Sequence, residues 1–122
     1  MFCQRAKLYR YDNATKEWKE RGVGEMKILH HVGHGSYRLL LRREQVHKVV
    51  CNFLITPDVE FHPLSTSNQA WMWAGMNYAE QEPCAEQLAV KFKSPDLTRQ
   101  FKAHVDNIQQ ELREKRIAEG SS

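Results

Sequence analysis

The amino-acid sequence predicts a mainly β domain in which seven strands form one bent antiparallel sheet, or a partly closed barrel, closed by a single C-terminal helix. Three observations support this fold class. The chain has 122 residues, of which 41% are hydrophobic, and this is enough to build one core and therefore one domain. Residues 6–93 divide into short strand-like segments between turn-forming residues. Only the last part of the chain has the apolar spacing of a helix.

The first four predicted strands form two hairpins. The strands alternate in polarity or are rich in strand-forming residues, and turn-forming residues join each pair. Residues 12–15 supply Asp and Asn, which hydrogen-bond to their own backbone and tolerate left-handed geometry. A second turn is expected at residues 33–35, and the Gly-Val-Gly sequence at 22–24 is expected to separate the two hairpins. The four strands are residues 6–11, 16–21, 25–31 and 37–43.

Three further strands are predicted after the second hairpin. Residues 46–56 are rich in β-branched and aromatic side chains and end at Pro57, which cannot donate a backbone hydrogen bond. Residues 70–78 and 87–93 also have strand-like patterns. The intervening residues 61–68 contain a proline and several small polar residues, so we expect a loop or a short irregular edge strand there.

The C-terminal segment has a clear helix start. Ser94 can cap the helix, Pro95 is tolerated at the first helical position, and Asp96 complements the helix dipole. Apolar residues then recur at steps of three or four, forming one stripe that must cover an apolar surface. Residues 1–118 would then form the domain, and residues 119–122 a disordered tail. The stripe consists of Leu97, Phe101, Val105, Ile108 and Leu112.

Charge is unevenly divided along the chain. The net charge is +3, but residues 1–48 contain 11 Lys and Arg against 5 Asp and Glu, whereas residues 49–122 contain 7 against 10. A basic first half suits docking to an acidic partner, through a field that speeds encounter and weakens with salt. The alternative is a solvated surface whose charges are simply unevenly placed.

Several classes of function are not supported by the sequence. The three cysteines are odd in number and widely spaced, so neither a disulfide framework nor a zinc site is indicated, and Cys51 is expected to be a packed strand residue. His30, His31 and His34 straddle a predicted turn with no nearby acidic or thiol ligand, so we expect surface histidines and no metal. The sequence lacks a phosphate-binding glycine loop, a nucleophile motif, an apolar run that could span a bilayer and an RNA-binding aromatic motif. We therefore predict a binding module that is not an enzyme, needs no cofactor and contacts neither membrane nor nucleic acid.

The basic segment from Arg38 to Lys48 is the strongest candidate for a docking surface. The two-residue period of a strand places Arg38 and Arg42 on one face and Arg43 on the other, each face mixing cations with apolar side chains. Guanidinium groups hold carboxylates in a two-pronged fashion that lysine cannot match, so an acidic peptide or a phosphate is the expected ligand. The alternative is a solvated pair of strands whose cations form salt bridges to glutamates such as Glu44.

Trp18 is the other unusual residue, because charged residues surround it in the sequence. An aromatic side chain in this setting is either a core anchor or an exposed docking platform. We favour the core.

An ordered series of short segments runs through nearly the whole chain. The series comprises Arg5-Ala6-Lys7-Leu8, Glu17-Trp18-Lys19-Glu20-Arg21-Gly22, Lys27-Ile28-Leu29, Leu39-Leu40-Leu41-Arg42-Arg43-Glu44-Gln45-Val46, Asn52, Ile55-Thr56-Pro57, Ala70-Trp71-Met72-Trp73, Glu86-Gln87-Leu88-Ala89 and Phe92-Lys93. In this order the segments resemble the signature of the Ran-binding domain family. The segments are most similar to those of the repeated domains of the large cytoplasmic-filament nucleoporin, with the small soluble cytosolic Ran-binding protein as the second choice.

The resemblance implies a pleckstrin-homology-like fold that binds the small GTPase Ran in its GTP state. It implies that the acidic C-terminal tail of Ran lies against a basic patch of the domain. It also implies that the domain is a monomer, helps to free Ran from importin and exportin receptors, and assists the Ran GTPase-activating protein. The implied location is the cytoplasmic face of the nuclear pore complex or the cytoplasm. The residues expected to contact Ran are Trp18, Lys19, Arg21, Arg38, Arg42, Arg43, Lys48 and Asn52.

The chain departs from the family pattern in two respects. Members of the family usually have an acidic arm before the first strand that embraces Ran, whereas this chain begins at Met1-Phe2-Cys3, so we expect either reduced affinity or a sequence from which the arm has been trimmed. The residues at Phe53 and Gln69 also differ from those usual in the family. Two other ligands fit related folds: a proline-rich peptide, bound through Tyr9, Tyr11 and Trp18, or a phosphoinositide, bound by the same cations.

Overall fold

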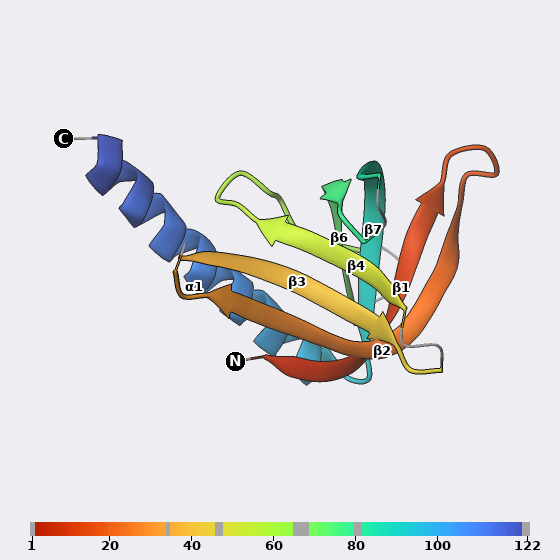
Figure 1. The fold of residues 1–122 in the computed structure, drawn as a ribbon. Coiled ribbons are helices and arrows are strands. Elements are labelled where there is room, and N and C mark those ends of the chain that lie inside the picture. The colour runs from red at the N-terminus through yellow and green to blue at the C-terminus, as the bar shows by residue number, and fades with distance from the viewer. Residues whose placement is uncertain (1, 34, 46–47, 65–68, 80–81, 121–122) are drawn as a thin grey trace.

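The computed structural model describes residues 2–33, 35–45, 48–64, 69–79 and 82–120. Seven antiparallel strands form one sheet in the order β4-β3-β2-β1-β7-β6-β5, and one helix follows them. The sheet curls into a half-barrel, and α1 contacts β7 and β4 across its open side (Figure 1). The predicted fold class is therefore confirmed. The elements are β1 (Cys3–Asp12), β2 (Glu17–His31), β3 (Ser36–Arg43), β4 (Val49–Ile55), β5 (His62–Pro63), β6 (Ala70–Asn77), β7 (Cys84–Phe92) and α1 (Pro95–Gly120).

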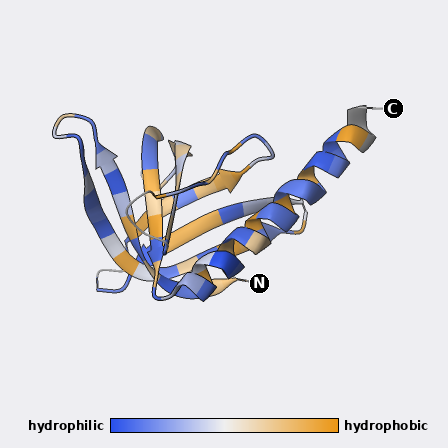
Figure 2. Ribbon diagram, turned by 180° about the vertical axis from the view of Figure 1, so that it is seen from behind, coloured by the Kyte–Doolittle hydropathy of each residue, from blue (hydrophilic) through white to orange (hydrophobic). Residues whose placement is uncertain are grey.

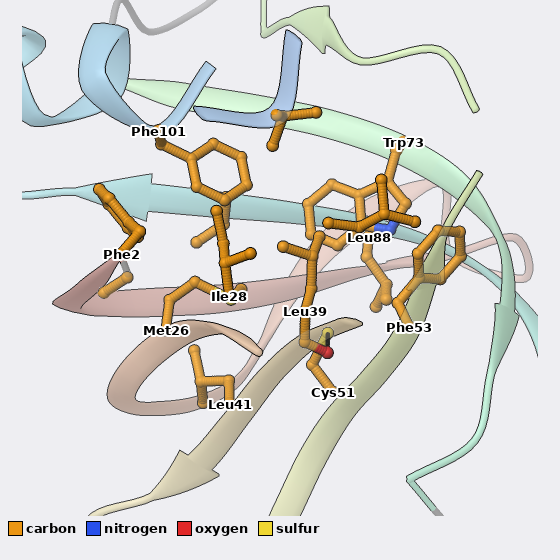
Figure 3. Packing of buried hydrophobic residues seen from close by; sticks show 14 of the residues in the cluster. Phe2, Met26, Ile28, Leu39, Leu41, Cys51, Phe53, Trp73, Leu88 and Phe101 are labelled. Atoms are coloured by element: carbon orange, nitrogen blue, oxygen red, sulfur yellow. Dashed lines mark hydrogen bonds between the residues drawn. The ribbon is translucent and has the colours of Figure 1, made fainter. Parts of the chain in front are cut away.

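The core fills the concave side of the sheet and is closed by the apolar stripe of α1 (Figure 3). Phe101 is completely buried, and its ring centroid lies 5.5 Å from that of Phe2, 6.1 Å from that of Phe61 and 5.1 Å from that of Phe92. These rings come from the N-terminal segment, the β4–β5 connection, β7 and the helix. One cluster therefore joins the two ends of the chain.

Hydrogen bonds fix the position of α1. The predicted cap forms, because the backbone N–H of Leu97 donates to Oγ of Ser94 at 3.3 Å. Further along, Nε2 of Gln109 donates to the carbonyls of Thr56 and Val59 at 2.9 and 2.7 Å. The helix continues through Gly120, and its mostly hydrophilic far end extends beyond the sheet (Figure 2). In the tail predicted from Glu119 onward, residues 121–122 lie outside the described part of the chain.

The prediction that Gly22-Val23-Gly24 separates two hairpins is wrong. The structure joins the second and third predicted strands into one long strand, β2, which pairs with β1 from Glu17 to Lys27 and with β3 from Gly24 onward. Glycine is needed here because a side chain would have no room. An added Cβ on Gly24 would overlap the backbone oxygen of Arg42. Glycine within a strand often marks such a close approach of two backbones. The strand count stays at seven because His62–Pro63, inside the segment expected to be a loop or an edge strand, pairs with β6.

Replacing Gly24 by alanine is expected to lower the free energy of unfolding by about 2 kcal/mol, because overpacking forces the backbone to shift. Urea denaturation followed by tryptophan fluorescence measures the change. Gly33→Ala is the matched control, since its nearest atoms belong to the exposed His31 side chain, and it should change stability much less. Equal losses from the two variants would contradict the close approach of β2 and β3.

Candidate functional site

The outer face of β2, β3 and β4 carries most of the predicted basic strand. In the observed register, Leu40 of β3 lies between Lys27 of β2 and Asn52 of β4. Arg38 and Arg42 are each two residues from Leu40, so they lie on the same face, while the residues between them point into the core. We refer to Lys27, Arg38, Leu40, Arg42 and Asn52 as the β3 patch.

Arg38 is held in place within the β3 patch. Its Nη1 donates to Oδ1 of Asn52 at 3.1 Å, and its guanidinium carbon lies 6.0 Å from the ring centroid of Tyr78. The backbone N–H of Tyr78 in turn donates to the carbonyl of Asn52 at 2.9 Å. These contacts orient the guanidinium, yet within the described part of the chain they use one of its five N–H donors. Arg38 is therefore oriented and still able to bind a carboxylate.

Arg42, like Lys27, is an exposed cation of the β3 patch. Among the residues that the structure describes, its guanidinium makes no hydrogen bond or ion pair. It lines a hollow of about 440 Å³ together with Lys27 and Leu29. Glu25 lies opposite Arg42 in the register, but its carboxylate is 4.0 Å from Nζ of Lys27, and Glu44 pairs with an arginine of β1. The neighbouring glutamates Glu25 and Glu44 therefore do not neutralise the charge of Arg42.

Arg43 and Lys48 lie where β3 passes to β4. The backbone N–H of Arg43 donates to the carbonyl of Lys48 at 2.8 Å. The Arg43 side chain covers Gly22, where an added Cβ would lie 2.6 Å from its Cγ. Arg43 nevertheless lines the same hollow as Arg42. Lys48 is exposed next to this end of the β3 patch.

The three predicted site residues on β2 lie elsewhere, where β2 pairs with β1 alone. Nζ of Lys19 is 2.9 Å from Oδ2 of Asp12. This ammonium and the backbone N–H groups of Ala14 and Thr15 hold the pKa of Asp12 below its ordinary value. Any stability from the ionised carboxylate is therefore present above its unfolded pKa and is lost as the pH falls through the lowered, folded value. Arg21 is the extra residue of a β-bulge, and its Nε is buried without a hydrogen-bond partner in the described part of the chain.

Trp18 is half-buried and does not join the core cluster. Its ring lies edge-on to that of Tyr11, with the centroids 5.3 Å apart. It also lines a hollow of about 430 Å³ beside Met72 and Trp73. The expected core position is therefore wrong, and Trp18 occupies the rim of a hollow separate from that of the β3 patch.

Asn77, at the end of β6, connects β6 to β4 beside the β3 patch and was not predicted from the sequence. It is 4% exposed; its Nδ2 donates to the carbonyl of Val50 at 3.0 Å, and its Oδ1 accepts from the backbone N–H of Asn52 at 2.9 Å. A side chain thus satisfies edge groups of β4 that a neighbouring strand would otherwise bind. Asn77 thereby positions Asn52, which in turn orients Arg38.

Replacing Asn77 by alanine is expected to lower the free energy of unfolding by about 3 kcal/mol, because it leaves a part-buried N–H and a buried carbonyl of β4 unpaired. Chemical denaturation measures the loss. Asn13→Ala, in the exposed β1–β2 turn, is the control and should be nearly neutral. A loss below about 1 kcal/mol for Asn77→Ala would contradict this bridging role.

Lys27, Leu29 and Tyr78 were also absent from the sequence prediction of the site. The alternation of Lys27 and Leu29 with buried Met26 and Ile28 on β2 could have placed the first two on the outer face. Tyr78 follows the end of β6, far from β3 in sequence, and no local pattern points to its contact with Arg38.

Cys51 is fully buried, as expected for a packed residue, and burial, with a smaller effect of Glu86, raises its pKa to about 12. His30 and His31 are exposed, and the third histidine of their cluster lies outside the described residues. No group of His, Cys, Asp or Glu in the described ranges is arranged to hold a metal ion. The helix in these ranges lacks the apolar length needed to cross a membrane.

Comparisons with known proteins agree with this architecture. The chain is 46% identical over 112 residues to the E3 SUMO-protein ligase RanBP2 of Homo sapiens and 43% identical to the human RanBP2-like and GRIP domain-containing protein 4. In each case 92% of this chain is covered, but only 4% and 6% of the longer relative. The chain therefore corresponds to a small part of these proteins.

Two solved structures share the fold. The Ran-binding domain of Nup2 from Ashbya gossypii matches with a TM-score of 0.73 and 26% identity, covering 91% of this chain and 94% of that one. The EVH1 domain of Dm DCP1, solved with the XRN1 DBM peptide, matches with a TM-score of 0.69 over 90% of this chain and 75% of its own, but at 11% identity it indicates the fold alone. The family model described as the RanBP1 domain matches residues 1–111, and this chain therefore belongs to the RanBP1 domain family.

Proposed function

We propose that this chain is a non-enzymatic module that binds GTP-loaded Ran in nuclear transport. Membership of the RanBP1 domain family and similarity to Ran-binding domains support the partner. The observation that carries the proposal is the β3 patch, where Arg42, which makes no hydrogen bond or ion pair with any described residue, lies on one face with Lys27 and the oriented Arg38. Such a face fits an acidic ligand.

The acidic C-terminal tail of Ran is the proposed ligand of the β3 patch. Its carboxylates would accept from the free N–H donors of Arg38 and Arg42, while Leu29 and Leu40 provide apolar surface between the charges. Arg43 and Lys48 would extend the basic surface at the end of β3. Trp18, Lys19 and Arg21 lie along the β1–β2 hairpin and would contact a different part of Ran.

Binding of the tail explains the proposed consequences in transport. A module that holds the tail away from the body of Ran would favour release of Ran from importin and exportin receptors and assist the Ran GTPase-activating protein. The relatives include the Nup2 domain, described as a nuclear pore complex component. We accordingly propose that the chain acts at the cytoplasmic face of the nuclear pore or in the cytoplasm, as a monomer when isolated.

Isothermal titration calorimetry with Ran loaded with a non-hydrolysable GTP analogue or with GDP tests this function. The GTP form should bind about 100-fold more tightly, because we propose that GTP loading frees the acidic tail of Ran and so makes it available to the β3 patch. Equal affinity for the two forms, or no binding to either, would contradict the proposal.

A proline-rich peptide is the second candidate ligand. The edge-on pair of Tyr11 and Trp18, next to a hollow, is the observation that favours it. Titration with a polyproline peptide separates the two functions, since Trp18→Ala should abolish peptide binding while Arg42→Glu should leave it unchanged.

A further inference from the structure

A second basic surface lies on the outer face of β1 and β7. Lys7 and Lys91 are direct partners in the antiparallel register, so their side chains emerge side by side on one face. Ala6 pairs with Phe92, and continuing this register brings Arg5 beside Lys93. We refer to Arg5, Lys7, Lys91 and Lys93 as the β1–β7 patch.

The charges of the β1–β7 patch are incompletely neutralised. Arg5 pairs with Glu44 at 2.7 Å, and Nζ of Lys7 is 3.8 Å from Glu20. Lys91 and Lys93 are exposed and, in the ranges that the structure describes, their ammonium groups have no carboxylate partner. Like charges directly opposite each other on neighbouring strands are destabilising. Lys7 and Lys91 therefore form a site where an anion from another molecule would relieve repulsion.

The β1–β7 patch surrounds its own hollow, of about 540 Å³, which all four cations line. Val23 and Leu97 line it too, and both are half-buried, so they do not project from the surface. Carboxylates separate this hollow from the β3 patch, because Glu25 lies between Arg5 and Arg42 in the register. The two basic surfaces are therefore distinct.

We propose that the β1–β7 patch docks an extended acidic segment of a partner protein, with carboxylates at every second residue. Side chains on one face of a strand repeat at about 7 Å, and this spacing separates Arg5 from Lys7 within β1, while Lys93 follows directly after the end of β7. An extended peptide lying along the strands presents alternate side chains at the same spacing of about 7 Å. Each carboxylate that faces the sheet would then contact a pair of cations. A membrane surface fits less well, since the apolar residues Val23 and Leu97 are half-buried and offer little surface to insert. This inference goes beyond the proposed function and does not depend on it.

Fluorescence anisotropy with three labelled decapeptides of different pattern tests the repeat. The first alternates Glu with Thr, the second has five Glu followed by five Thr, and the third alternates Gln with Thr. The alternating acidic peptide should bind several-fold more tightly than the block peptide of equal charge, and the Gln peptide should not bind. Equal binding of the two acidic peptides would overturn the spacing argument.

Paired variants of the whole chain test the location. Lys91→Gln with Lys93→Gln should weaken binding of the alternating peptide about tenfold, because two carboxylate contacts are lost. Arg99→Gln with Arg113→Gln removes the same charge from the exposed face of α1 and should have little effect. Equal losses from both pairs, or a loss only from Arg38→Gln with Arg42→Gln, would refute the site and leave the proposed Ran function untouched. Binding to vesicles containing phosphatidylinositol bisphosphate, without binding to the peptide, would assign the surface to lipid and overturn the proposal.

Discussion

Charge reversal of both Arg38 and Arg42 to glutamate is expected to weaken binding to full-length, GTP-loaded Ran by about 100-fold. Each exposed ion pair contributes up to about 1 kcal/mol, and each reversal adds repulsion of similar size. A total near 3 kcal/mol corresponds to about two orders of magnitude in affinity. Isothermal titration calorimetry at fixed salt measures the change, and raising the salt should reduce it.

Two controls make the Arg38 and Arg42 prediction specific. Ran without its acidic tail should lose little affinity on the same reversal, since the ligand of the β3 patch is gone. Arg99→Glu with Arg113→Glu imposes the same charge change on exposed positions of α1 and should leave binding to full-length Ran nearly unchanged. Arg43→Glu should have an intermediate effect, because its side chain also covers Gly22 while lining the hollow. Equal losses against full-length and tail-less Ran would contradict the assignment.

The part of the site that sequence could predict is the part governed by strand period. Alternation along β3 placed Arg38 and Arg42 together and Arg43 on the other face, and the structure has them so. Strand periodicity relates residues within one strand, so it could not show whether Lys19 lies near these arginines. The structure places Lys19 on the stretch of β2 that pairs with β1 alone, and only the strand register reveals this.

Contacts between residues far apart in the sequence could not be predicted from local sequence patterns. Asn77 and Tyr78 reach β4 and β3 only when the sheet curls, and an asparagine before a turn has an ordinary local explanation. Gly22 and Gly24 illustrate the opposite difficulty. Glycines that end a strand and glycines that let two backbones approach have the same local sequence, so the turn was predicted where the strand continues. The fold class survived because the apolar stripe of α1 and the strand count do not depend on that choice.

Replacing Phe101 by alanine is expected to lower the free energy of unfolding by about 4 kcal/mol. Phe101 is completely buried against Phe2, Phe61 and Phe92, and truncating such a ring removes apolar burial and leaves a cavity that the curled sheet cannot fully close. The lost stability should mainly weaken the packing of α1 against the sheet, because the Phe101 ring lies at the centre of the contact between helix and sheet. Urea denaturation measures stability, and amide hydrogen exchange of α1 reports its docking.

Since Phe101→Ala could leave too little folded protein to measure, Phe101→Leu provides a second test with an expected loss of about 1 kcal/mol. Ile117→Ala is the matched control on the same helix, because Ile117 is 70% exposed on the end that extends beyond the sheet. It should change neither stability nor exchange in the first turns of α1. If Ile117→Ala destabilised the protein as much as Phe101→Leu, the far end of α1 would be part of the core contact, and the assignment of helix docking to the Phe101 cluster would be wrong.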